Sequence, residues 1–78
     1  RKVDKQGNVA HGDPLLVDCQ NCVVYHETGE EDRAVAVLGA KDLVVVVTPD
    51  AVLVMPKDRA ENLRTVVEQL RKRGAGQL

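Results

Sequence analysis

A chain of 78 residues holds one small domain, which buries only about 60% of the surface that its unfolded chain would expose. Its 11 basic and 12 acidic residues leave a net charge of −1, so no uniform field attracts nucleic acid or an anionic membrane. No apolar run approaches the roughly 20 residues that cross a bilayer, and no signal-peptide pattern is present, so we expect a cytoplasmic protein.

The apolar residues are short and branched. Hydrophobic residues make up 44% of the chain, but it has no Phe and no Trp, and its single aromatic residue is Tyr25. The core must therefore consist of Val, Leu and Ala, and Val suits the pleated, half-buried surface of a strand. The composition predicts a compact, β-rich domain over residues 1–78.

Residues 1–12 read as a leading loop, with turn signals at Gly7-Asn8 and at 11–14 around one brief strand at Val9-Ala10. Two strands follow at 15–18 and 22–25, separated by a polar corner at 19–21. Residues 26–33 form an acidic, exposed loop that contains Glu27, Glu30, Glu31 and Asp32.

Three further strands are predicted at 34–38, 43–48 and 51–55, so that strands occupy 15–56. Their apolar runs are continuous, which indicates strands covered on both faces by a coiled sheet or a partner surface. A six-residue period places Val or Leu at 17, 23, 35, 47 and 53, but Gly29 and Lys41 interrupt it.

A helix is predicted over 58–73. Asp58 would cap it, with Glu61 three residues later as in a capping box, and an apolar stripe would pack on the strands. The stripe consists of Ala60, Leu63, Val66, Val67 and Leu70. Basic residues 71–73 suit a helix C-terminus, and Gly74 would end the helix before a tail at 74–78.

Cys19 and Cys22 form a C-x-x-C motif, and His11 and His26 complete four possible zinc ligands. The histidines lie far from each other in the sequence and flank the cysteines, whereas zinc modules usually pair two tight knuckles. A redox dithiol lacks the βαβ context that would lower a thiol pKa. We therefore expect Cys22 to pack inwards as a small hydrophobic residue and Cys19 to lie at the turn, and we assign no metal ligand, with the four-residue zinc site as the weaker alternative.

The residues that catalysis needs are scarce. The chain has no Ser, its Thr residues have no spacing that links them to a base, and the acids of residues 27–32 crowd one loop instead of facing each other in a cleft. Its glycines do not form a phosphate-binding loop between a strand and a helix. We assign no catalytic and no cofactor-binding residue and expect a binding or structural domain.

The strand region as a whole resembles the C-terminal part of mannose-1-phosphate guanylyltransferases over about residues 7–72. The likeness lies in a series of phrases in a fixed order: Gly7-Asn8-Val9, Gly12-Asp13, Leu15-Leu16-Val17-Asp18, Asn21-Cys22, Val35-Ala36-Val37, Leu38-Gly39, Lys41-Asp42-Leu43-Val44-Val45-Val46, Thr48-Pro49-Asp50-Ala51 and Pro56-Lys57-Asp58-Arg59-Ala60. Cys19 and the long acidic loop depart from the family's pattern.

The resemblance implies a parent enzyme that transfers GMP from GTP to mannose 1-phosphate with Mg²⁺, giving GDP-mannose and pyrophosphate. It implies that this segment is a fragment of a longer chain and contains no catalytic residue and no cofactor of its own. It further implies a short left-handed β-helix-like coiled sheet with one C-terminal helix. Its partners would be the N-terminal catalytic domain and a second subunit of a homo-oligomer. Whether a cupin domain follows this segment is left open.

An alternative from another class is an independent small β interaction module with a structural Cys/His zinc site. Unfolding by a chelator would favour that alternative.

Overall fold

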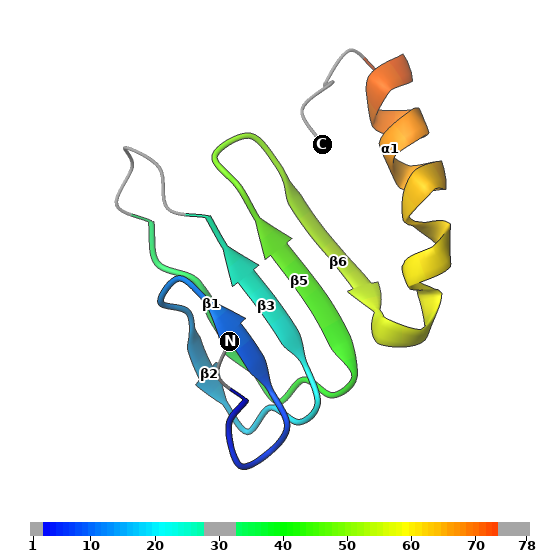
Figure 1. The fold of residues 1–78 in the computed structure, drawn as a ribbon. Helices are drawn as coiled ribbons and strands as arrows, with labels where there is room; N and C mark the ends of the chain where they lie inside the picture. Colours follow the sequence, from blue (N-terminus) through cyan, green and yellow to red (C-terminus); the bar gives the residue numbers. More distant parts are fainter. Residues whose placement is uncertain (1–2, 28–32, 74–78) are drawn as a thin grey trace.

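The computed structural model describes residues 3–27 and 33–73, which form a short β-coil followed by helices (Figure 1). The strands and helices, in chain order, are β1 (Val9–His11), β2 (Leu15–Val17), β3 (Val23–His26), β4 (Ala36–Leu38), β5 (Leu43–Val47), β6 (Val52–Pro56), the 3₁₀ helix η1 (Lys57–Asn62) and α1 (Leu63–Lys72). The prediction of a mainly β domain with one C-terminal α-helix is confirmed.

The strands form a coil because the chain alternates between two sheets. The first sheet has the order β1-β3-β5-β6 and the second contains β2 and β4. Pairing is parallel in β1–β3, β3–β5 and β2–β4, and a parallel bridge joins Gln20 to Lys41 on the third side of the coil. The final hairpin, β5–β6, is antiparallel. This topology makes the domain β-helix-like, while the hand of the coil stays a prediction.

The coil repeats unevenly. Val23 lies beside Val9 in the first sheet, and Val44 lies beside Val23, so the second turn of the coil takes up more of the chain than the first. The difference arises between β3 and β4, where residues 27–35 replace the short 12–14 connection of the first turn. The number of residues from Val9 to Val23 is not a multiple of six, and neither is the number from Val23 to Val44. This explains why the six-residue period in the sequence is only partial. The tip of the predicted acidic loop, residues 28–32, lies outside the described residues.

Corners of the coil use residues that tolerate a positive φ. Asn21 and Asp42, with φ of 54° and 56°, lie one above the other, and the Asn21 amide donates to the Asp42 carboxylate at 2.7 Å. Asp18 and Gly39, which follow paired residues of β2 and β4, form a second such pair with φ of 54° and 68°. Asn, Asp and Gly visit this left-handed region most readily, so the polar corners of the sequence set the turns.

The core lies inside the coil. It contains Cys19, Cys22, Val24, Val45 and Val47, each less than a tenth exposed, with half-buried Leu16, Val35, Val37, Ala40 and Leu43 packed around them. Except for Val35, which directly precedes β4, these residues come from strands or corners. The expectation that Val, Leu and Ala build the interior is confirmed, with the two cysteines as additional members.

The helical region differs from the prediction. A 3₁₀ helix starts directly after β6, where Pro56 has an extended backbone, and Arg59 leaves helical geometry at φ −110°, ψ 17°. The α-helix begins only at Leu63, and Asn62 at its N-cap makes no side-chain capping bond. The predicted Asp58–Glu61 capping box is therefore wrong, because the kink at Arg59 separates the first turn from the α-helix. The predicted end at Gly74 and the tail at 74–78 lie outside the described residues.

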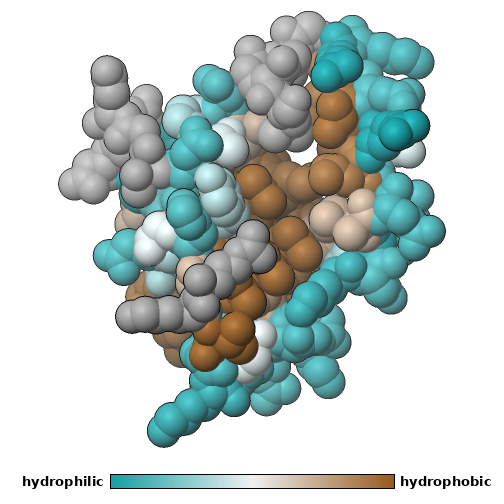
Figure 2. Space-filling view, viewed as in Figure 1, coloured by the Kyte–Doolittle hydropathy of each residue, from teal (hydrophilic) through white to brown (hydrophobic). Residues whose placement is uncertain are grey.

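The apolar stripe of α1 does not join the core. None of its residues is buried, Val66, Val67 and Leu70 are half-buried, and Leu63 is 37% exposed. In Figure 2 apolar side chains gather over β5 and β6 and continue towards α1, with hydrophilic side chains at the border. The prediction that the stripe thickens the core is wrong, since the kink places α1 beside the coil. Within the described residues, no helix has the length and hydrophobicity needed to cross a membrane.

Candidate functional site

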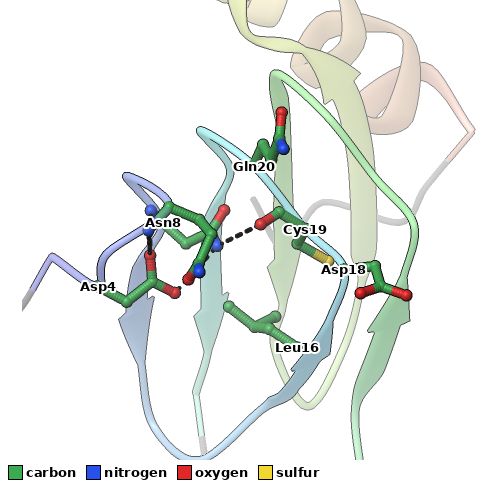
Figure 3. Close-up of a pocket in the computed structure, with 7 residues that line it drawn as sticks. Asp4, Asn8, Leu16, Asp18, Cys19 and Gln20 are labelled. Carbon is green, nitrogen blue, oxygen red and sulfur yellow. Dashed lines mark hydrogen bonds between the residues drawn. The ribbon is translucent and has the colours of Figure 1, made fainter.

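A polar hollow of about 370 Å³ opens at the N-terminal end of the coil (Figure 3). Its lining comes from the leading turn and from the corner after β2, and consists of Asp4, Gln6, Asn8, Leu16, Asp18, Cys19 and Gln20. Figure 3 shows the Asn8 side chain between the Asp4 carboxylate and the backbone of Cys19. The chemistry of this hollow depends on which of these groups are free.

Asn8 is 3% exposed, and its polar atoms are all engaged. Its Nδ2 donates to the carbonyl of Cys19 at 2.8 Å and to Asp4 Oδ2 at 3.0 Å, while its Oδ1 accepts from the N–H of Cys22 at 2.9 Å. Its own N–H donates to Asp4 Oδ1 at 2.8 Å. The Asn8 side chain thus takes the place of strand pairing at this corner, and it joins the leading loop to the corner at 19–22.

Asp4 is held in the same network. The Asn8 side chain, followed by backbone N–H groups of residues 6–8, donates to its carboxylate and lowers the pKa of Asp4 below its ordinary value of 3.8. The carboxylate also accepts from the N–H of Gln6 at 2.9 Å. Because its oxygens serve the turn, this carboxylate is a structural acceptor and not a free acid or base.

The two thiols also have structural partners. Cys19 Sγ lies 3.2 Å from the carbonyl oxygen of Val37 and 3.4 Å from that of Val17, and Cys22 Sγ lies 3.3 Å from that of Gln20. Both cysteines are free and buried, at 3% and 0% exposure. Buried thiols that donate to carbonyl groups behave as small hydrophobic residues.

The four residues of the alternative zinc site do not converge. His11 lies directly beside Tyr25 in the β1–β3 register, and the two rings stack with centroids 4.4 Å apart. His26 is one residue further along β3, so its ring points to the opposite face of the sheet, where it is 7% exposed. Among residues 3–27 and 33–73, no three His, Cys, Asp or Glu side chains are placed to hold a metal ion. The structure therefore gives this alternative no support.

His26 is nevertheless unusual. Its Nδ1 is buried and has no hydrogen-bond partner among the described residues. Gly12, which lies beside it, has φ +85°, and a Cβ at position 12 would overlap the carbonyl oxygen of His26. The turn after β1 therefore lies in close contact with the backbone of His26 at the end of β3.

A second hollow, of about 540 Å³, lies where η1 meets the Asn21–Asp42 corner. Lys57 Nζ donates to Asn21 Oδ1 at 2.8 Å, and the Lys57 N–H donates to the carbonyl of Asp42 at 2.7 Å. The side chain of Lys57 is therefore a clamp that fixes the start of η1 to the coil. The Lys57-Asp58 phrase of the family resemblance has a structural explanation here.

No reactive pair emerges from the described residues. Cys19, Cys22 and Thr48 donate to backbone carbonyl groups and not to a side-chain base. Glu27 is exposed, and the other acids of its loop lie outside the described residues. The sequence reasoning recognised Gly7-Asn8 as a turn but missed the buried role of Asn8, for which the adjacent turn was the only local signal.

Comparison with known proteins agrees with this architecture. The family profile described as the MannoseP isomerase/GMP-like beta-helix domain matches residues 3–70. A solved structure described as a mannose-1-phosphate geranyltransferase from Thermus thermophilus superimposes with a TM-score of 0.69 and 42% identity. The match covers 87% of this chain and 20% of that one.

Curated relatives show the same relation. Alginate biosynthesis protein AlgA of Pseudomonas aeruginosa is 42% identical over 91% of this chain, and mannose-1-phosphate guanylyltransferase of Escherichia coli K12 is 42% identical over 88%. Xanthan biosynthesis protein XanB of Xanthomonas campestris pv. campestris strain B100 is 41% identical over 91%. The chain spans about 14% of the length of each of these relatives. It belongs to the MannoseP isomerase/GMP-like beta-helix domain family.

Proposed function

We propose that this chain is the accessory and assembly domain of an enzyme that transfers GMP from GTP to mannose 1-phosphate, yielding GDP-mannose and pyrophosphate. The observation that carries the proposal is identity of about 40% along nearly the whole chain to proteins named mannose-1-phosphate guanylyltransferase. The activity itself belongs to the remaining polypeptide, with GTP and Mg²⁺ bound there.

The internal chemistry of the domain supports an accessory role. The side chains that would be candidates for catalysis have structural roles. Asn8 and Asp4 join two turns by hydrogen bonds, both thiols donate to backbone carbonyl groups, and Lys57 holds η1 on the coil. Two free cysteines also suit a reducing compartment, and we place the parent enzyme in the cytoplasm.

The partners that we propose are the N-terminal catalytic domain of the same polypeptide and a second subunit. Support comes from the apolar side chains that remain exposed on the coil, including Leu15, Leu38 and Val52, each more than 60% exposed. A small domain that leaves such side chains in contact with solvent is suited to packing against other protein surfaces.

The test is an assay of GDP-mannose formation by the parent chain, supplied with GTP, mannose 1-phosphate and Mg²⁺. We expect product from the parent chain and none from the 78-residue segment under the same conditions. Pyrophosphorolysis of GDP-mannose by the segment alone would contradict an accessory role. A parent chain that forms no GDP-mannose from GTP would contradict the proposed activity. Light scattering on the parent chain measures whether it is a homo-oligomer.

A further inference from the structure

One side of the helical region is open to solvent and combines apolar with charged side chains. A hollow of about 660 Å³ lies along it, and among the described residues its lining comes only from η1 and α1. Figure 1 shows these elements beyond β6, at the edge of the domain. The apolar part of the lining consists of Ala60, Leu63 and Val67, of which Leu63 is 37% exposed. The coil therefore leaves this side of the helix open to a partner.

The charged part of the lining alternates in sign along the helix. It consists of Glu61, Arg64, Glu68 and Arg71, and all four are exposed. Within the part of the chain that the structure describes, none of these four side chains forms an ion pair or a hydrogen bond. Their spacing of three or four residues puts them on one flank of the helix. The hollow is thus an apolar strip with a row of unpaired charges along its border.

This row of charges is complementary to itself when its direction is reversed. Val66 is the midpoint between Glu61 and Arg71, and it is also the midpoint between Arg64 and Glu68. A second copy of α1 that runs antiparallel, with a two-fold axis near Val66, would therefore place every acid of the row opposite a base of the partner subunit. An isologous contact of this kind uses the same surface on both copies.

The apolar residues and the ends of the helix favour the same arrangement. Leu63 precedes Val66 by about as many residues as Leu70 follows it, so the axis brings Leu63 close to Leu70 of the partner subunit. Antiparallel helices also place the positive N-terminus of one beside the negative C-terminus of the other. A parallel pair would instead bring the basic residues 71–73 of both copies together.

The order of the charges distinguishes α1 from the other exposed apolar surfaces. Leu15, Leu38 and Val52 are each more than 60% exposed, but their strands, β2, β4 and β6, contain no charged residue. An apolar strand without charges fixes neither the direction nor the register of a partner. The hollow along α1 fixes both, and the sequence that complements it is its own.

We propose that the hollow along α1 is an isologous interface at which two copies of the chain pair through antiparallel helices. Glu61 contacts Arg71 of the partner subunit, and Arg64 contacts Glu68 of the partner subunit, so that each contact occurs twice. This inference rests on the proposed function, which includes a second subunit, and adds the surface and the orientation of the contact.

Charge reversal in the full-length parent chain tests the pairing. Arg71→Glu places two acids at each outer contact, and Glu61→Arg places two bases there. Either variant alone should have a dissociation constant at least about tenfold higher than the unsubstituted chain in sedimentation equilibrium at low ionic strength. An equimolar mixture of the two variants has an acid opposite a base at both outer contacts. The mixture should therefore regain a dissociation constant within about threefold of the unsubstituted value.

The recovery on mixing separates contact between copies from an effect on the helix itself. Glu61 and Arg71 are ten residues apart, on the order of 15 Å along one helix, so they cannot contact each other within one copy. Lys72→Glu is the matched control, because it makes the same change of charge beside Arg71 at an exposed residue that does not line the hollow. It should leave the dissociation constant within about twofold, and circular dichroism checks that each variant keeps its fold.

Several results would overturn the proposal. A parent chain that stays monomeric would do so, as would single variants that associate like the unsubstituted chain or a mixture that does not recover. An equal loss of association in Lys72→Glu and Arg71→Glu would show an effect of net charge and not of pairing. GDP-mannose formation by the unsubstituted parent is measured separately, so failure of the proposed activity is distinguished from failure of this interface.

Discussion

Replacing Asn8 by Asp should destabilise the domain severely, although the two side chains have nearly the same shape. The amide donates to the carbonyl of Cys19 at 2.8 Å and to Asp4 Oδ2 at 3.0 Å. A carboxylate has no hydrogen to donate, so one of its oxygens would face two other oxygens in a buried position. The bond from the N–H of Cys22 to the other oxygen would remain.

The magnitude follows from the number of groups left without a partner. Each buried polar group that loses its hydrogen bond lowers the free energy of unfolding by about 1–3 kcal/mol. Asn8→Ala leaves two such groups unpaired, the Cys19 carbonyl and the Cys22 N–H, so the expected loss is about 2–6 kcal/mol. We expect at least the same loss from Asn8→Asp at neutral pH, because oxygen–oxygen repulsion is added. At about 0.05–0.15 kcal/mol per residue, a chain of 78 residues has a total free energy of unfolding of roughly 4–12 kcal/mol.

The assay is urea unfolding followed by far-ultraviolet circular dichroism, with Asn62→Asp as the matched control. Asn62 is exposed, and its Oδ1 accepts from Arg59 Nε at 2.8 Å, a bond that a carboxylate keeps, so its free energy of unfolding should change by less than about 0.5 kcal/mol. The defect of Asn8→Asp should shrink as pH falls, because a protonated carboxyl regains one donor. An Asn8→Asp variant within about 0.5 kcal/mol of the unsubstituted chain at pH 7 would refute the assigned role.

Three further predictions concern the corners and the clamp. Gly12→Ala should unfold the domain or lower its free energy of unfolding by more than about 3 kcal/mol, because the new Cβ meets the carbonyl of His26. Gly39→Ala has open space around it and should lower the free energy of unfolding by only about 1–2 kcal/mol, through backbone strain, in the same urea titration. The lowered pKa of Asp4 contributes stability that is present above pH 3.8 and is lost as pH falls through the folded-state pKa. Asp4→Asn should therefore flatten the pH dependence of the free energy of unfolding in urea below about pH 4. An unchanged dependence on pH in this acid range would contradict the role of Asp4. Lys57→Met removes a hydrogen-bonding clamp at the surface, so it should cost no more than about 1 kcal/mol while raising amide exchange in η1, and unchanged exchange there would show that the clamp has no effect.

The strands and corners were predictable because local chemistry sets them. Asn21 lies in the predicted corner at 19–21, and Asp42 lies between the strands predicted at 34–38 and 43–48. Both adopt the left-handed backbone that Asn and Asp tolerate. The continuous valine run of β5 predicted cover on both faces, but only its inner side chains, Val45 and Val47, are buried by the coil, while Val44 and Val46 are half-buried. Pro49 and Asp50 lie between the strands predicted at 43–48 and 51–55, and in the structure Thr48 and Ala51 close this turn through backbone and side-chain bonds.

Features that depend on distant contacts could not be predicted. The interval from β1 to β3 is shorter than the interval from β3 to β5 because of an inserted connection, and no local pattern specifies which strands then lie together. The kink at Arg59 is a backbone departure within a sequence that has good helical periodicity. The zinc alternative gains no support for a related reason, since His11 and His26 lie on opposite faces of one sheet.

The role of α1 follows from where stability resides in the domain. The coil encloses its core with side chains of β3 and β5 and of the corner at 19–22, and it needs no residue of α1 to do so. The helix is held mainly through η1, whose first residue is fixed to the corner by Lys57. Its half-buried Val66, Val67 and Leu70 are therefore apolar surface that the coil alone leaves incompletely covered. The coil therefore provides the fold, and the outer apolar side chains of the domain remain in contact with solvent.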